Sequence, residues 1–349
     1  MKRSVVYEIR LNKIKRWLKR HKFDGILISS PENRRYLSGY TPQDVSITES
    51  AGFLLITPSE AFILTDPRYQ EEAQNLSLFE PVIYRKGLAR ALSSLAERLK
   101  IKGLLYEENY LSCGRLKALK KALPKVEFSG VSGVIEKWRE VKDQEEMRLL
   151  EKARELALKI FRILSKEIQP GRTEKEIAWR ITELSHRLGE GPSFPPIVAS
   201  GPNAARPHAE PEDKPLRSGE VVIVDLGVKY RGYCSDLTRT FFLGRVPERL
   251  REAHHLVKEA QRLAQPYMKP GLKIREADRK VRAFFQKAGV LQNYLHSLGH
   301  GLGLAVHEAP AVSFRSRRKF KVGQVVTLEP GLYFPGLGGV REEEMVFIR

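Results

Sequence analysis

The feature that most constrains the fold is an internal repeat in the second half of the chain. Residues 169–191 and residues 269–290 each begin with a Pro-Gly turn and continue as a charged amphipathic helix. In the first copy, Thr173 and Glu176 have the spacing of a capping box. Matched features at one constant offset are not expected from chance. We therefore predict that the chain beyond about residue 135 is an α/β domain of two related halves with pseudo-twofold symmetry.

The two halves also match in their histidines and acids. ARPHAEP parallels LAVHEAP, and GEVVIVDLG parallels GQVVTLEPG, and each β-branched run leads through a turn into a further strand with an acid. One histidine and two acids recur in each half: His208, Asp225 and Asp236 in the first, and His307, Glu329 and Glu343 in the second. Two symmetric halves are expected to converge on one shared site.

The strand acids predict a cluster of carboxylates. If Tyr230 and Arg231 form the tip of the first hairpin, Asp225 and Asp236 lie directly opposite each other, about 5 Å apart. Two carboxylates that close cannot both stay ionised without a counter-charge, and a bound cation is the usual remedy. The second hairpin repeats the arrangement with its own two acids, so four carboxylates are expected to meet.

Four converging carboxylates would balance the charge of two divalent cations. His300 has no counterpart in the first half and would add one nitrogen ligand. Oxygen-rich coordination with a single imidazole suits Mn²⁺, Fe²⁺, Co²⁺ or Zn²⁺. Two such ions about 3.5–4 Å apart can hold a bridging hydroxide and polarise a carbonyl. The pattern thus predicts a metal-assisted hydrolase.

The region before the repeat has a different pattern. KFDGILISS and EAFILTD are typical of short buried strands, and RALSSLAERLK is typical of a helix. We expect a smaller α/β domain over residues 1–133 and the repeated domain over residues 134–349.

Charge and cysteine content limit the other classes of function. The net charge is +19, with basic clusters at residues 13–22 and 315–321, but the other basic residues alternate with glutamate along helices. We therefore do not expect nucleic acid as a specific partner. No apolar run approaches the roughly 18 residues that span a bilayer, so no membrane partner is expected. Cys113 and Cys234 are too few for a disulfide framework, which favours a cytoplasmic protein.

The acids and their surroundings resemble the pita-bread metallopeptidase family, which includes methionine aminopeptidases, aminopeptidase P and prolidase. The matching motifs are VDLG, SDLTRT, HSLGHGLG, LEPG and VREEE. FPPIVASGPNAARPHAEP and HEAP resemble the proline-specific branch, and DGILISSPENRRYLSGY and TDPRY resemble a creatinase-type N-terminal domain. The resemblance implies a creatinase-like domain followed by a pita-bread catalytic domain, and a homodimer.

The resemblance also implies a metal-ligand set. Asp225 and Asp236 would hold one ion, and His300 and Glu329 would hold the other. Asp236 and Glu343 would bridge the two. Mn²⁺ or Co²⁺ is expected, with Zn²⁺ or Fe²⁺ as alternatives.

Further residues take catalytic roles by the same resemblance. Glu329 would accept a proton from the bridging water, and His208 and His307 would contact the scissile carbonyl or the leaving group. Arg341 would orient a bridging carboxylate. His296 is expected only to support the site.

The predicted reaction is hydrolysis of the Xaa-Pro bond in dipeptides or short peptides, with a metal-bridging hydroxide as the nucleophile. Dipeptidase and aminopeptidase P both stay open, because Ala311 follows HEAP where archaeal-type prolidases tend to have arginine. Arg315, Arg317 or Arg318 could replace that arginine. The alternative function is a catalytically silent pita-bread protein whose basic surface binds nucleic acid or other polyanions.

Overall fold

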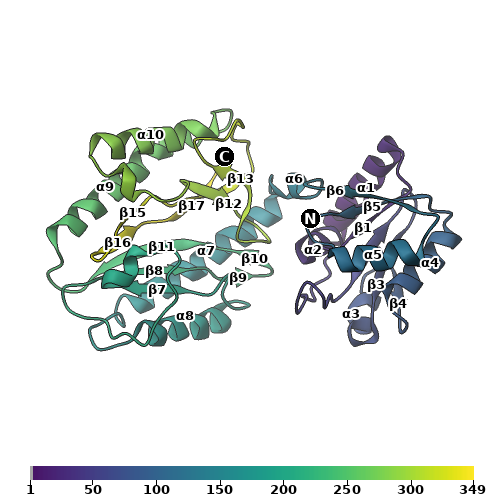
Figure 1. Ribbon diagram of the computed structural model, residues 1–349, viewed down its shortest axis with the longest axis horizontal. Helices are drawn as coiled ribbons and strands as arrows, with labels where there is room; N and C mark the ends of the chain where they lie inside the picture. Colours follow the sequence, from purple (N-terminus) through teal and green to yellow (C-terminus); the bar gives the residue numbers. More distant parts are fainter. Residues whose placement is uncertain (1–2) are drawn as a thin grey trace. The chain divides into compact units, whose positions relative to one another are not determined.

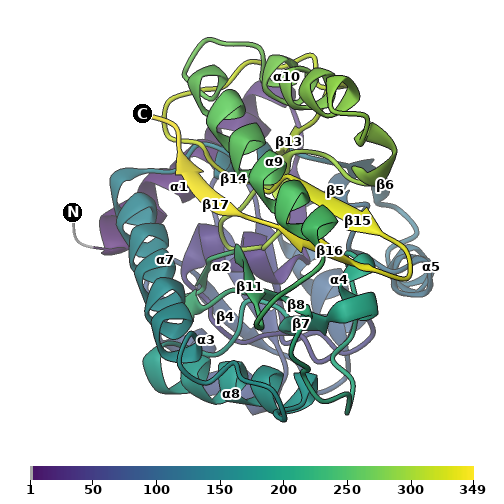
Figure 2. The same ribbon diagram turned by 90° about the vertical axis from the view of Figure 1, so that its left-hand side faces the viewer.

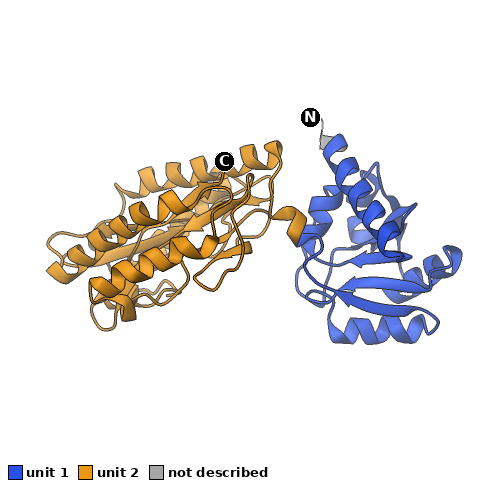
Figure 3. Cartoon of the chain, turned by 90° about the horizontal axis from the view of Figure 1, so that it is seen from above, with its two compact units in different colours: residues 1–136 blue, residues 137–349 orange. Residues whose placement is uncertain are grey.

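The computed structural model describes residues 3–349 and divides into two compact units, residues 1–136 and 137–349 (Figures 1 and 3). The division falls slightly beyond the boundary expected at residue 133. Among the described residues, no helix combines the length and the apolar content that crossing a membrane requires.

The first unit is built on a six-stranded sheet in the order β4-β3-β2-β1-β5-β6. Its strands are β1 (Gly25–Ile28), β2 (Phe53–Ile56), β3 (Ala61–Thr65), β4 (Glu80–Ile83), β5 (Gly103–Glu107) and β6 (Glu127–Val131). Strands β1 and β3 confirm the two buried strands predicted from the sequence. Both are buried along their whole length, as expected for central strands covered on two faces.

Helices of 5 to 19 residues accompany this sheet. They are α1 (Arg3–His21), α2 (Pro31–Ser38), α3 (Gln70–Gln74), α4 (Leu88–Arg98) and α5 (Cys113–Ala122), with a 3₁₀ turn, η1, at Pro67–Tyr69. Helix α4 confirms the helix predicted there and buries Leu88, Leu92 and Leu95, which share one face. These leucines pack in the same core as Phe53 and Phe62 of the sheet.

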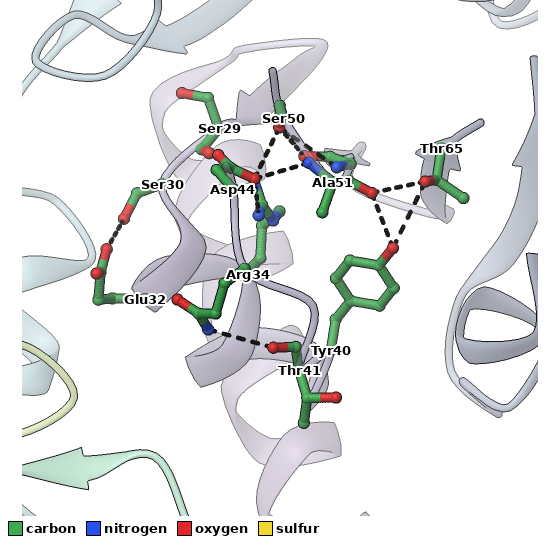
Figure 4. A network of polar contacts seen from close by, with 12 residues as sticks. Ser29, Ser30, Glu32, Arg34, Tyr40, Thr41, Asp44, Ser50, Ala51 and Thr65 are labelled. Atoms are coloured by element: carbon green, nitrogen blue, oxygen red, sulfur yellow. Dashed lines mark hydrogen bonds and ion pairs between the residues drawn. The ribbon is translucent and has the colours of Figure 1, made fainter. Parts of the chain in front are cut away.

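A buried polar network fixes the irregular segment between α2 and β2 (Figure 4). Arg34 is fully buried and donates to Asp44 Oδ1 at 2.6 Å and to Ser50 Oγ at 3.1 Å. Asp44 Oδ1 also accepts a hydrogen bond from the Ala51 N–H at 2.7 Å. Tyr40 donates to the Ala51 carbonyl at 2.8 Å, and burial raises the pKa of Tyr40 to about 12. Side-chain hydrogen bonds thus hold this segment in place of the backbone hydrogen bonds of a helix or a sheet.

The second unit contains the repeat. Its helices are α7 (Gln144–Leu164), α8 (Glu174–Leu188), α9 (Glu248–Ala264) and α10 (Ile274–Lys287), and the short α6 (Glu136–Arg139) lies at the unit boundary. Three 3₁₀ turns are η2 (Gly201–Ala205), η3 (Gln265–Tyr267) and η4 (Leu291–Asn293). The strands lie between α8 on one side and α10 on the other (Figures 1 and 2).

The strands form small antiparallel sheets in each half. The first half has β7 (Ile197–Ser200), β8 (Val221–Leu226), β9 (Lys229–Tyr230), β10 (Tyr233–Cys234) and β11 (Leu237–Phe242). The second half has β12 (Gly299–Gly301), β13 (Glu308–Val312), β14 (Val325–Leu328), β15 (Gly331–Phe334), β16 (Gly338–Arg341) and β17 (Glu344–Phe347). The sheet orders are β11-β8-β7 and β13-β12-β14-β17, with separate β10-β9 and β15-β16 pairs. Each half therefore supplies a helix and an antiparallel strand pair, which confirms the predicted duplication.

The two halves join along β11. The Glu343 N–H donates to the Thr238 carbonyl at 3.1 Å, and the Thr240 hydroxyl donates to the Arg341 carbonyl at 2.8 Å. Glu342 accepts hydrogen bonds from the Thr240 N–H at 3.0 Å and from His254 Nε2 at 2.9 Å. These contacts bring the acid-bearing strand ends of both halves to one place.

Candidate metal centre

All five predicted metal ligands line one cavity of about 450 Å³ in the second unit. They are Asp225, Asp236, His300, Glu329 and Glu343. The cavity walls also include three other histidines, His208, His296 and His307, and one cation, Arg341. The structure therefore brings together every site residue predicted from the sequence.

The ligand atoms are close enough to share bound ions. His300 Nε2 lies 3.6 Å from Asp236 Oδ2 and 3.5 Å from Glu329 Oε1. One ligand atom each from Asp236, His300 and Glu343 lie within 4.8 Å of one another. This is the separation expected of side chains that can coordinate a common cation.

The acids reach the cavity from strand ends. Asp225 lies near the end of β8, Asp236 just before β11, Glu329 just after β14 and Glu343 just before β17. In the β14–β17 ladder Leu328 pairs with Glu344, so continuation of that register sets the two glutamates opposite each other as predicted. Apolar strands thus carry the acids into the interior.

The predicted register of the first hairpin is wrong. Asp225 pairs with Thr238, not with Asp236, because the tip of the hairpin consists of Arg231 and Gly232 rather than Tyr230 and Arg231. Arg231 has φ 50° and Gly232 has φ 83°, and a tight two-residue turn requires such positive φ values. Asp225 and Asp236 nevertheless share the cavity, diagonally rather than as a direct pair.

Electrostatics shows that the acids need a counter-charge. Burial raises the pKa of all four carboxyl groups, and it raises the pKa of Glu329 to about 7. The negative charges of the other acids raise the pKa values of Asp236 and Glu343 further, well above the ordinary range. Each acid therefore opposes the ionisation of its neighbours.

The donor set fits divalent cations. Asp225 Oδ1 is buried and has no hydrogen-bond partner among the described residues, which leaves it available as a ligand. Burial, together with the nearby His307, lowers the pKa of His300 to about 4, so its imidazole stays neutral. Carboxylate oxygens and one neutral imidazole are the ligands that Mn²⁺, Co²⁺, Zn²⁺ and Fe²⁺ accept.

Arg341 is hydrogen-bonded to one of the acids and is linked to another through Thr238. Its guanidinium donates to Asp225 Oδ2 at 2.8 Å, to the Tyr333 hydroxyl at 2.8 Å and to Thr238 Oγ1 at 3.1 Å. Thr238 Oγ1 in turn donates to Glu343 Oε2 at 2.8 Å. The resemblance predicts that Arg341 orients a bridging carboxylate, whereas its direct contact is with Asp225 and it reaches Glu343 through Thr238.

The histidines occupy different positions in the cavity. The ring of His307 lies 4.2 Å from the ring of His300, and burial together with the nearby His208 lowers the pKa of His307. His208 lines the cavity from the turn after η2. His296 Nε2 is 2.9 Å from the Tyr333 hydroxyl, and burial lowers the pKa of His296 to about 4. His296 thus belongs to the surrounding hydrogen-bond network.

Sequence reasoning missed three hydrogen-bonding residues around the ligands. Thr238 and Tyr333 contact Arg341, and Thr327 donates to Glu329 Oε1 at 3.2 Å. Both threonines lie within the recurring motifs SDLTRT and VVTLEPG. A polar residue inside an otherwise apolar buried strand was the signal that could have found them.

Both parts of the chain match known protein families. Residues 148–349 match metallopeptidase family M24, and residues 10–141 match the creatinase/prolidase N-terminal domain. The chain is 35% identical to the Xaa-Pro dipeptidase of Pyrococcus furiosus, over 97% of this chain and 94% of the relative.

Solved structures show the same fold over nearly the whole chain. An Xaa-Pro dipeptidase from Bacillus anthracis superposes with a TM-score of 0.92 at 34% identity, covering 98% of this chain and 95% of the other. An X-Pro aminopeptidase from Thermotoga maritima gives 0.85 at 33% identity, covering 95% and 94%. The predicted pita-bread catalytic domain with a creatinase-type N-terminal domain is confirmed, and the chain belongs to metallopeptidase family M24.

Proposed function

We propose that the protein is a two-metal peptidase that hydrolyses the Xaa-Pro bond at the N-terminus of dipeptides and short peptides. The observation that carries the proposal is the convergence of four buried, mutually repelling carboxylates and a neutral imidazole in one cavity. In this proposal Asp225, Asp236, His300, Glu329 and Glu343 hold two divalent ions, Mn²⁺ or Co²⁺ before Zn²⁺ or Fe²⁺. Such ions supply Lewis acidity for the carbonyl and lower the pKa of the attacking water.

The protein's own groups divide the remaining work. Glu329 accepts a proton from the attacking water. His307 and His208 donate hydrogen bonds to the scissile carbonyl and to the leaving group. Arg341 keeps Asp225 in position.

The cavity also suits proline after the scissile bond. Phe194, Pro195, Ile197 and Val306 form an apolar part of its wall, against which a pyrrolidine ring can pack. A proline nitrogen carries no N–H, so a peptidase that grips the scissile amide through that donor cannot bind it. The proposed site needs only the carbonyl oxygen and a water.

Peptides longer than two residues fit the cavity at least as well as dipeptides. Arg341 is its single cation among the described residues, and its nitrogens already donate to Asp225, Tyr333 and Thr238. Arg318 pairs with Glu140 instead of reaching the cavity. A free carboxylate on the proline would therefore enter without a counter-charge, which is costly, whereas a continuing amide would not.

The test is hydrolysis of Ala-Pro and Ala-Pro-Ala after chelation and after reloading with Mn²⁺ or Co²⁺, with Met-Ala-Ser as the control. We expect metal-restored cleavage of both proline peptides, with kcat/KM for Ala-Pro-Ala equal or higher, and none of the control. Cleavage of Ala-Pro alone would establish a strict dipeptidase. No cleavage with Mn²⁺ or Co²⁺, nor after reloading with Zn²⁺ or Fe²⁺, would refute the proposal and favour the alternative of a silent polyanion-binding protein.

The proposal also includes a cellular location and an oligomeric state. We propose a cytoplasmic protein, because neither Cys113 nor Cys234 is in a disulfide, and a homodimer, because a creatinase-type domain is present. Cell fractionation tests the first, and light scattering of the purified protein tests the second.

A further inference from the structure

A buried ion triad lies next to the candidate metal centre. Glu308, which directly follows His307, accepts hydrogen bonds from Arg139 through Oε1 and from Lys142 through Oε2, the latter at 3.3 Å. The three side chains are 7%, 4% and 1% exposed. Burial opposes ionisation of Glu308, but the charges of Lys142 and Arg139 outweigh it and lower the pKa of that carboxyl group.

Glu308 also fixes the backbone of the loop that precedes it. Its Oε1 accepts a hydrogen bond from the Ala305 N–H at 3.0 Å. A Cβ placed on Gly303 would lie 2.8 Å from Glu308 Oε2, so the carboxylate packs directly against this backbone. The far side of the loop is held by the Cys234 N–H, which donates to the Gly303 carbonyl at 2.8 Å. The loop between β12 and β13 is therefore clamped at both faces.

His307 depends on this clamp for its position. Among the described residues its ring has no hydrogen-bond partner, although it contacts the ring of His300. The orientation of the imidazole is then set by the backbone on either side of it. On one side that backbone belongs to Glu308, whose side chain is held by Arg139 and Lys142. A side chain of this kind is sensitive to small movements of its loop.

The cations of the triad are themselves rigidly held. The Lys142 N–H donates to the Gly323 carbonyl at 2.8 Å. Glu140, which lies between the two cations in the sequence, accepts hydrogen bonds from Gln324 and Arg318. Arg139 and Lys142 thus form a fixed platform, contributed by the first residues of the second unit.

We propose that Arg139 and Lys142 are positioning residues that act through Glu308 to hold His307 in its working orientation. The proposal rests on the function proposed above, in which His307 donates to the reacting carbonyl. Neither cation lines the cavity, so their effect on the reaction is indirect.

The first experiment is a double-mutant cycle in the metal-loaded full chain. We expect Lys142→Met to lower kcat for Ala-Pro-Ala by about 10- to 100-fold, the loss that a displacement near 1 Å can cause, with KM changed less than about twofold. In a His307→Ala background the same substitution should lower kcat less than about twofold, since coupled residues are non-additive. Lys142→Arg should restore most of the activity. Lys214→Met is the matched control, because it removes another lysine–glutamate pair, with Glu220, from the same unit away from the cavity.

The second experiment does not depend on activity. Amide hydrogen exchange over residues 301–308 should be faster in Lys142→Met and in Arg139→Gln than in the wild type, and unchanged in Lys214→Met. An undiminished kcat in Lys142→Met, or a full additional loss in the His307→Ala background, would overturn the positioning role. If the wild type cleaves no peptide, the proposed function fails, and unchanged exchange in the loop would separately refute the clamp.

Discussion

At the scale of single residues, the acids of the metal centre make the metal-free fold sensitive to pH. Burial raises the pKa of Glu329 from 4.5 to about 7, and it also raises the pKa values of Asp225, Asp236 and Glu343. A carboxyl group with a raised pKa stabilises the fold while it is protonated and loses this contribution as the pH rises through that pKa. A bound cation removes the cost because it stabilises the charged form.

The resulting prediction concerns the metal-free protein between pH 5.5 and pH 7.5, within the range between the ordinary and the raised pKa of Glu329. Burial lowers the pKa values of His296 and His300 from 6.5 to about 4, which makes stability rise with pH over the same range, so the effect of Glu329 is measured as the difference between the wild type and Glu329→Gln. Relative to the chelated variant, the free energy of unfolding of the chelated wild type should fall by about 2 kcal/mol from pH 5.5 to pH 7.5. Urea unfolding in the presence of a chelator measures this change.

The controls for this prediction are the metal-loaded protein and the chelated Glu329→Gln variant. The chelated variant supplies the reference, and the metal-loaded wild type should lack the additional fall, because the cation stabilises the ionised carboxylate. An equal pH dependence of stability in all three samples would locate that dependence outside the metal centre.

At the scale of elements, the repeat offers a matched pair of helix N-termini. Helix α8 begins with a capping box in which Thr173 accepts from the Glu176 N–H at 3.1 Å and Glu176 accepts from the Thr173 N–H at 2.8 Å. Helix α10 begins at the equivalent place with Lys273 as its N-cap, whose side chain makes no capping hydrogen bond. Glu276 stands three residues later, where a capping box has its glutamate, and its carboxylate now pairs with Arg275.

We predict opposite effects at these two N-termini. Thr173→Ala should lower the free energy of unfolding by about 1 kcal/mol, and Lys273→Thr should raise it by up to about 1 kcal/mol by completing a second capping box. Urea unfolding of the metal-loaded protein measures both changes, and Lys273→Ala, which should shift stability by less than about 0.5 kcal/mol, is the control. If Thr173→Ala left the free energy of unfolding unchanged, the capping box would not contribute to stability.

Element pairing is also where prediction from the sequence reached its limit. The acids could be found because they interrupt runs of apolar β-branched residues, and burying an unpaired charge is costly. The apolar runs did not determine the register of the first hairpin. The same two runs can form strands whether the turn lies at Tyr230 and Arg231 or one residue later. The physical signal was Gly232, since the second position of a tight hairpin turn favours glycine, and it places the turn at Arg231 and Gly232. Arg139 and Lys142 carried no sequence signal, because only the tertiary fold brings them to Glu308.

At the scale of the whole molecule, the metal centre and the N-terminal core belong to different units. Every predicted ligand lies within residues 137–349, whereas the core that contains Phe53, Phe62 and Leu92 lies within residues 1–136. A ligand stabilises only the cooperative unit that binds it. The change in sequence pattern predicts two domains, but the stability of each is a separate physical question.

We therefore predict two thermal transitions that respond differently to metal. Loading with Mn²⁺ or Co²⁺ at about 100 times the dissociation constant should add about 2.7 kcal/mol to the second unit and raise its Tm by about 5–10 °C. The transition of the first unit should stay within about 1 °C, because it binds no ion in this proposal. Scanning calorimetry of chelated and reloaded protein measures both, and Asp236→Asn should remove most of the shift. A single transition that moves as one would mean that the two units unfold cooperatively, and the metal centre would then stabilise the entire chain.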